Sequence, residues 1–276
     1  MITCKEFPKK EFATQKELFA ELRKNEKSII AIKKAESQES YKKGYQFDGF
    51  LTRTDGDASK TGPHMKEGFI YPIINTTKYM DSHNDVHFDG IWSKSIKDQA
   101  GKLFYVTNHK VEVETIIAWP SDVNAMVKSV PWSFVGKDYE GNTEALIFEI
   151  DKTKIVHAKA MEIISEKRPV QNSVRMRYVR IKLAMNSNEP ADKEYKAYYD
   201  ARINEIANKD QVAELGYFWG VEEAKIETEG SMVIRGSNDA TPIRQKDEAA
   251  DSTSEHKDEP VETTQTKQFF INPNLF

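Results

Sequence analysis

Short apolar runs of strand length, separated by turn residues, constrain the fold of this chain more than any other sequence feature. These runs lie at residues 29–32, 69–74, 103–107, 144–150, 174–181 and 219–234. Apolar residues at helical spacing predict helices at residues 11–27, 154–165 and 192–215. Ser121 stands where it would cap a further short helix that reaches Lys128. The chain is therefore predicted to mix strands and helices in one fold.

The last part of the chain, residues 238–276, has a composition that does not support a core. It is rich in Asp, Glu, Ser, Thr and Lys and has almost no apolar residue before Phe269. Such a segment buries too little apolar surface to offset the entropy lost on ordering. We therefore expect an N-terminal helical arm at 1–27, a folded domain at 28–237 and a disordered acidic tail at 238–276.

Charge and cysteine content exclude several classes of protein. The tail holds eight acidic and four basic residues, so its net charge of −4 equals that of the whole chain, and residues 1–237 are formally neutral. No basic excess is available to bind nucleic acid directly. The single cysteine, Cys4, excludes an internal disulfide framework and a cysteine-based zinc site. No apolar run has the ~20 residues of a membrane helix, and the N-terminus lacks a signal-peptide core, so an intracellular protein is expected.

A serine and a histidine stand at the edges of two predicted strands. His109 follows the run at 103–107, and Ser173 precedes the run at 174–181. An imidazole that accepts the hydroxyl proton turns a serine into a nucleophile, and such groups assemble in space from distant parts of a chain. The pair is therefore a candidate catalytic nucleophile and base.

Four blocks in this order resemble the prohead maturation proteases of tailed phages, which share a fold with herpesvirus assemblin. The blocks lie at residues 86–96, 104–109, 162–174 and 224–233. The second ends in Asn108-His109, similar to the strand that carries the catalytic histidine, and the third leads into Ser173, similar to the turn before the nucleophile. The family usually has glycine two residues after the nucleophile, whereas this chain has Arg175.

The resemblance implies both a fold and a function. The fold would be a mainly antiparallel β-barrel surrounded by helices. The function would be that of a serine endopeptidase that cuts scaffold and major capsid protein precursors, and itself, during phage prohead maturation. It would need no cofactor or metal. It would act in the host cytoplasm inside the immature capsid, without contact with a membrane, and a homodimer is one form it could take.

The family pattern also assigns roles to individual residues. Ser173 would be the nucleophile, His109 the general base and Glu229 the third member that orients the imidazole, a place that herpesvirus relatives fill with histidine. Glu227 is the alternative third member. Arg175 and Arg177 lie on the nucleophile's face of the strand and are candidates to stabilise the oxyanion. Arg235 is a further candidate of this kind.

Two other functions remain open on the sequence. A protein that keeps the protease fold without activity would act as a scaffold or capsid-internal protein, and Arg175 at the usual glycine favours this. A metallohydrolase would instead use His83, Asp85 and His87, whose spacing allows three ligands for zinc or manganese. The apolar end at 268–276 would either fold back on the core or dock on a partner in the capsid.

Overall fold

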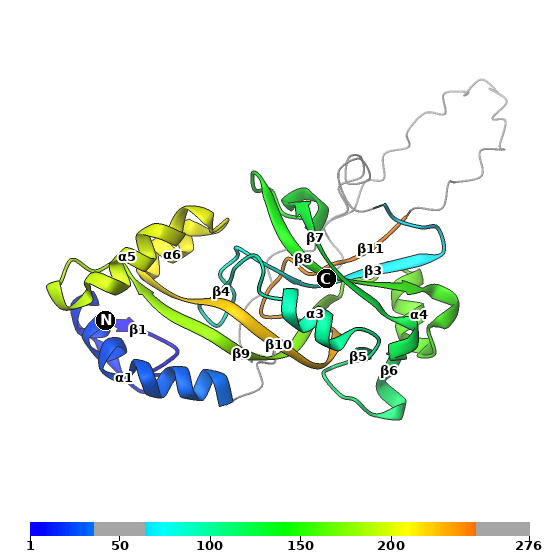
Figure 1. Cartoon of the computed structure of the whole chain (residues 1–276), viewed down its shortest axis with the longest axis horizontal. Coiled ribbons are helices and arrows are strands. Elements are labelled where there is room, and N and C mark those ends of the chain that lie inside the picture. Colours follow the sequence, from blue (N-terminus) through cyan, green and yellow to red (C-terminus); the bar gives the residue numbers. More distant parts are fainter. Residues whose placement is uncertain (36–63, 247–276) are drawn as a thin grey trace, which may run out of the picture. The chain divides into compact units, whose positions relative to one another are not determined.

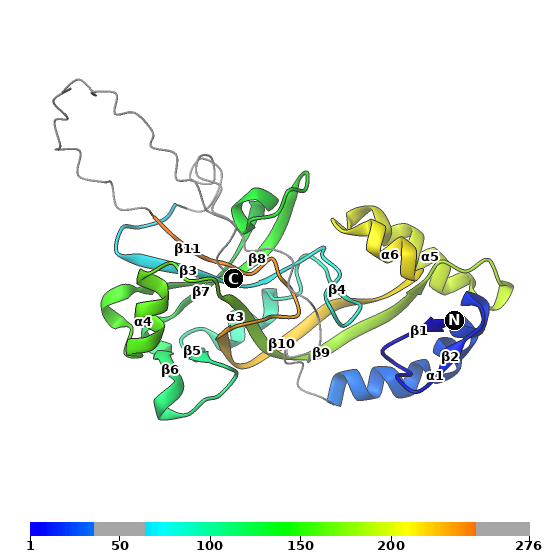
Figure 2. The ribbon, with the colours of Figure 1, turned by 180° about the vertical axis from the view of Figure 1, so that it is seen from behind.

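The longest strand, β10 (Tyr217–Val233), organises the main sheet of the computed structural model, which describes residues 1–35 and 64–246. β9 (Gln171–Met185) pairs with it in antiparallel direction, and Figure 2 shows the two strands side by side. β4 (Asp85–His87) and β5 (Phe104–Thr107) pair with β10 in parallel direction. β6 (Ile116–Ala118) extends the sheet beyond β5. β10 therefore brings together strands that lie more than 100 residues apart.

A second sheet has four strands in the order β11, β3, β8 and β7 (Figure 1). Their bounds are Ile243–Gln245, Phe69–Thr76, Asn142–Asp151 and Asn124–Pro131, and all neighbours are antiparallel. A small sheet joins β1 (Ile2–Thr3) to β2 (Glu11–Phe12). Most of these pairings agree with the predicted antiparallel preference.

Helices flank the sheets. The α-helices are α1 (Gln15–Ala35), α3 (Ser93–Gln99), α4 (Ala158–Ser165), α5 (Lys193–Arg202) and α6 (Lys209–Leu215). Short 3-10 helices occupy Val113–Thr115, Pro120–Asp122, Trp132–Val135, Lys152–Lys154, Pro190–Asp192 and Ile203–Glu205. α1 and α5 both contact β9, and α6 contacts β10. The described helices therefore cover part of the main sheet.

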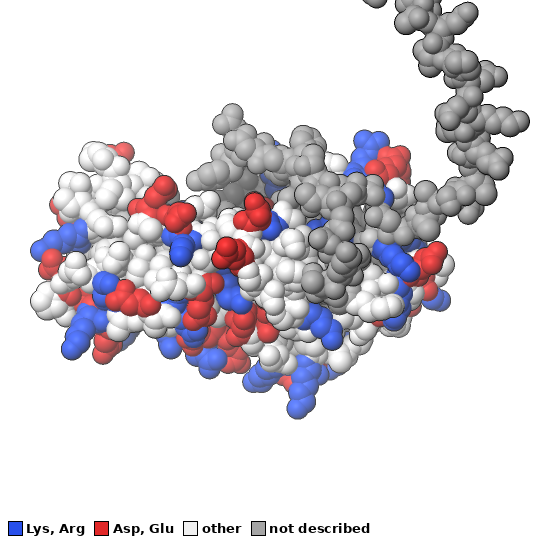
Figure 3. Space-filling view, turned by 90° about the horizontal axis from the view of Figure 1, so that it is seen from above, with Lys and Arg blue, Asp and Glu red and all other residues white. Residues whose placement is uncertain are grey.

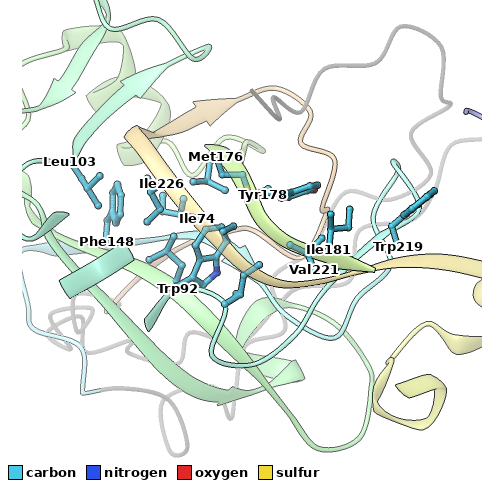
Figure 4. Packing of buried hydrophobic residues seen from close by; sticks show 14 of the residues in the cluster. Ile74, Trp92, Leu103, Phe148, Met176, Tyr178, Ile181, Trp219, Val221 and Ile226 are labelled. Atoms are coloured by element: carbon cyan, nitrogen blue, oxygen red, sulfur yellow. The ribbon is translucent and has the colours of Figure 1, made fainter. Parts of the chain in front are cut away.

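Gly230 lets the two larger sheets pack closely. A Cβ atom at this position would lie 2.6 Å from Phe148 on β8 and 2.9 Å from Ile74 on β3. Both side chains belong to the main apolar cluster, which also holds Trp92 and Ile226 (Figure 4). Glycine is required because any side chain would enter space that this core already fills.

The predicted closed barrel is wrong for the described residues. Both larger sheets are open, with edge strands β4, β6 and β9 in the first and β7 and β11 in the second. The sequence pattern shows where strands lie, but barrel closure depends on pairings between distant strands. What the structure confirms is the coarser prediction of a mixed fold of helices and strands with a mainly antiparallel pairing.

Several predicted elements also differ. The expected strand at 29–32 is the end of α1, because Ile29 lies two turns after Leu22 and continues its buried stripe. The expected helix at 121–128 is largely β7, which pairs with β8 along its whole length. The expected helix at 192–215 is interrupted, because the Asn208 side chain bonds the backbone of Met80. In each case tertiary contacts override the local pattern.

The predicted domain limits also change. The expected arm at 1–27 belongs to one compact unit with the other described residues up to 246, because Leu18 and Leu22 are fully buried in the main core. The expected domain end at 237 is too early, since β11 pairs with β3. The rest of the expected disordered tail, 247–276, lies outside the described residues, as does its apolar end. No described helix is long and apolar enough to cross a bilayer.

Acidic and basic side chains are interspersed on the face shown in Figure 3, without a large area of one sign. The ladder between β9 and β10 also carries ion pairs, among them Arg180 with Glu222 and Lys182 with Glu222. Such exposed pairs each contribute about 0–1 kcal/mol to stability. This face therefore offers no concentrated charge that would attract a polyanion.

Candidate active site

His109 stands in a tight turn immediately after β5. Asn108 has φ 52° and His109 has φ 57°, both in the left-handed region that favours glycine. The amide of Asn108 donates to the carbonyl of Met232 (3.0 Å), and the amide of His109 donates to Ser231 Oγ (2.9 Å). The end of β10 therefore holds this turn and aims the imidazole at the strand.

Glu229 meets the imidazole from β10. Its Oε1 lies 2.8 Å from His109 Nδ1, and both side chains are buried, Glu229 completely. The parallel pairing of β5 with β10 sets Glu229 opposite Phe104 and Ser231 opposite Val106, so the acid lies beside the strand that leads to the histidine. A carboxylate at Nδ1 places the ring proton there and leaves Nε2 as the basic nitrogen.

Ser173 lies on the neighbouring strand, directly opposite Ser231 in the pairing of β9 with β10. Opposite residues of an antiparallel pair have Cβ atoms about 5 Å apart. Since Ser231 Oγ accepts the amide of His109, the same residue neighbours both Ser173 and the histidine. Ser173 also lines a small pocket, to which neither His109 nor Glu229 contributes. Within the described residues, His109 Nε2 has no hydrogen-bond partner.

Arg175 does not stand as an isolated oxyanion donor. Its Nη2 donates to the carbonyl oxygen of His109, and its Nε lies 3.7 Å from Glu229 Oε1. Arg177 pairs instead with Glu227, and the Arg177 side chain is exposed. The geometry thus joins Arg175 to the histidine and the acid.

The alternative third member and the remaining oxyanion candidate lie elsewhere. Glu227 forms its ion pair with Arg177, whereas Glu229 reaches the histidine. Arg235 is exposed beyond the end of β10. Sequence reasoning missed Ser231, which holds the backbone of His109. Ser231 lies two residues after Glu229, on the same face of the strand, and this spacing is the signal that would have identified it.

The residues considered for metal binding serve other contacts. Asp85 Oδ1 forms an ion pair with Lys33 Nζ (2.6 Å), and its Oδ2 accepts from the Tyr178 hydroxyl (2.8 Å). The two ring nitrogens of His87 lie 3.1 Å from Asn75 Oδ1 and 3.3 Å from Tyr178 Oη. Burial lowers the pKa of His87 to about 4.

The proposed ligand set of His83, Asp85 and His87 is therefore not supported by the geometry. In the part of the chain that the structure describes, no three His, Cys, Asp or Glu side chains are arranged to hold a metal ion. Asp85 and His87 instead form a buried polar cluster beneath the main sheet. This cluster connects α1, through Lys33, to β4 and β9.

Comparison of the chain with protein-family models, with curated proteins and with solved structures finds no match. The interpretation of the site therefore depends on its geometry. That geometry joins a buried carboxylate, an imidazole and a serine on adjacent strands, together with an arginine that contacts two of the three.

Proposed function

We propose that this protein is a serine endopeptidase in which Ser173, His109 and Glu229 form the catalytic triad. The observation that carries the proposal is the buried 2.8 Å contact between His109 Nδ1 and Glu229, next to a strand register that sets Ser173 beside the same turn. A buried carboxylate that orients an imidazole near a serine is the arrangement that general-base activation of a hydroxyl requires.

The reaction follows from these positions. Ser173 Oγ attacks the carbonyl carbon of the scissile peptide while its proton passes to His109 Nε2. The tetrahedral intermediate then expels the amine, which takes that proton, and an acyl-enzyme remains. Water, deprotonated by the same nitrogen, releases the acid and restores the serine. Glu229 holds the ring and stabilises the imidazolium formed in both steps.

The substrate class follows from the resemblance to prohead maturation proteases. We propose that the enzyme cuts scaffold and major capsid protein precursors inside an immature phage capsid, and that it cuts itself. An extended peptide would approach the pocket that Ser173 lines. The resemblance of residues 104–109 and 162–174 to the family's catalytic segments supports this assignment.

One observation favours a second function. His109 Nε2 has no hydrogen-bond partner among the described residues, so the bond from nucleophile to base is not formed in this state. Catalytic hydrogen bonds are often long before substrate binds. A permanently unformed bond would instead fit an inactive scaffold or capsid-internal protein with the same fold.

Intact-mass analysis of Ser173→Ala distinguishes the two functions. The full chain is co-expressed with the precursor of its capsid protein, and Ser129→Ala, at an exposed serine on β7, serves as the matched control. We expect wild type and the control to trim the precursor or themselves, and Ser173→Ala to leave every chain whole. Equal cleavage by Ser173→Ala would refute the triad, and intact chains in all three would favour the scaffold function.

A further inference from the structure

Two adjacent residues of the site have a backbone conformation that needs support. Asn108 and His109 both have positive φ, and neither is glycine. Residues held in this region cost of order 1 kcal/mol each, and they persist only where surrounding contacts fix them. The two hydrogen bonds that these backbone amides donate to Met232 and Ser231 hold the N–H side of the turn. The carbonyl side needs a separate donor.

Arg175 supplies that donor. Its Nη2 binds the carbonyl oxygen of His109, so the turn is held from both sides. Arg175 lies two residues after Ser173 on β9, and side chains two apart share one face of a strand. A single arginine thus ties the histidine backbone to the strand that carries the serine. Because the guanidinium is planar and rigid, it restricts the orientation of the bound carbonyl more than a lysine ammonium would.

The same guanidinium contributes to the charge balance of the site. Glu229 is completely buried, and a buried carboxylate is costly unless cations or donors surround it. Arg175 Nε lies 3.7 Å from Glu229 Oε1, the oxygen that also contacts His109. The positive charge therefore lies beside the carboxylate that orients the imidazole.

We infer that Arg175 is a positioning residue of the triad, which clamps the left-handed turn of His109 and shares the charge of Glu229. The inference rests on the proposed function, and it replaces the oxyanion role expected from the sequence. The N–H that binds the backbone carbonyl of His109 is committed to the turn and is not available to the substrate. The arginine acts through His109 and Glu229, and it does not itself touch the reacting atoms.

Three full-length variants test the two parts of this role. Arg175→Gln removes the charge, and Arg175→Lys keeps the charge but loses the planar guanidinium. Arg177→Gln is the control because Arg177 forms its ion pair with Glu227. Each is assayed for kcat/KM against pH on a peptide that spans a cleavage site of the wild type. Far-ultraviolet circular dichroism verifies that each variant is folded.

We expect kcat/KM to fall about a hundredfold in Arg175→Gln, as misplaced catalytic groups commonly produce. The acidic limb of its pH profile should move upward by about one unit, because a cation near the imidazole is lost and the imidazolium is favoured. Arg175→Lys should keep the acidic limb at the pH of the wild type but show a lower kcat/KM. Arg177→Gln should match the wild type in both.

Two results would overturn the inference. One is that Arg175→Gln has the same pH profile and the same kcat/KM as the wild type. The other is a rate loss in Arg175→Gln and Arg175→Lys without any movement of the limb, which would indicate a purely structural or oxyanion role. If the wild type shows no cleavage, the proposed function fails, but the inference is still tested by NMR. Exchange of the Asn108 and His109 amide protons with solvent should then be faster in Arg175→Gln than in Arg177→Gln, and equal exchange rates would contradict the inference.

Discussion

In His87 and His109, the contacts of the buried ring decide whether the histidine can transfer protons. Both rings are buried, but His109 faces the carboxylate of Glu229, whereas the two nitrogens of His87 face an amide and a hydroxyl. Burial disfavours the imidazolium and outweighs the attraction of the nearby Asp81, so it lowers the pKa of His87 to about 4. His109 is therefore suited to proton transfer, and His87 is a neutral structural group.

This difference predicts a pH dependence of stability. The pKa of His87 is about 4 in the folded protein and about 6.5 in an unfolded chain, so the unfolded state binds the proton more readily. The stability from His87 is complete above about pH 6.5 and falls as the pH drops toward 4, by about 3 kcal/mol in all. Urea unfolding of the wild type and of His87→Gln between pH 4 and 7 measures it. The variant should show a flatter dependence, and parallel curves would contradict the assignment.

Among the elements, β10 meets three structural requirements within its 17 residues. It pairs on both sides, it carries Glu229 and Ser231 toward the turn after β5, and it passes close to the second sheet at Gly230. The register between β9 and β10 shifts between Ile226 and Gly230, next to these residues. Irregularities of this kind redirect side chains and are frequent beside active sites. The geometry of the candidate site thus depends on the strand as a whole.

Gly230→Ala tests the close approach of the two sheets. The added Cβ would lie 2.6 Å from Phe148 and 2.9 Å from Ile74, so the core must move. We expect a loss of about 1–3 kcal/mol, typical of overpacked cores, and a lower Tm. Thr228→Ala, at an exposed position of the same strand, is the control and should stay within about 0.5 kcal/mol of the wild type. Equal melting temperatures for the two variants would show that the sheets do not require glycine.

At the scale of the whole molecule, α1 is joined to the main sheet by polar contacts as well as by its apolar stripe. Lys33 at its last turn pairs with Asp85 of β4, 52 positions away, and Arg23 pairs with the buried Asp192. Glu26 also accepts from the hydroxyl of Tyr195 beside α5. These contacts explain why the N-terminal helix belongs to the same compact unit as the strands that carry the candidate site.

The Lys33–Asp85 pair predicts a coupling that a double-mutant cycle measures. Lys33→Met leaves the buried Asp85 without its cation, and breaking such a pair costs about 3–5 kcal/mol. Adding Asp85→Asn removes the uncompensated charge, so the double variant should recover part of that loss in denaturant unfolding. A double variant that loses the sum of the two single effects would show that the residues do not interact.

The sequence by itself determined the local elements and the chemical candidates. The strand runs that became β3, β5, β8, β9 and β10 are visible in the apolar pattern. Ser173 and His109 are identifiable at strand edges before any fold is known, and the family resemblance adds Glu229. Local propensity and side-chain chemistry depend on near neighbours, which the sequence order records. Whether these three residues act together is a hypothesis that the geometry supports and the cleavage experiment decides.

The tertiary structure alone decided which strands pair, and that pairing assigned the partners. The parallel pairing of β5 with β10 sets Glu229 against His109, and the register of β9 sets Ser173 opposite Ser231 and directs Arg175 to the histidine carbonyl. It also left both larger sheets open where the resemblance implied a barrel. Register between strands that lie far apart in the sequence is a sum of many weak packing and hydrogen-bond energies, and no short stretch of sequence contains that sum.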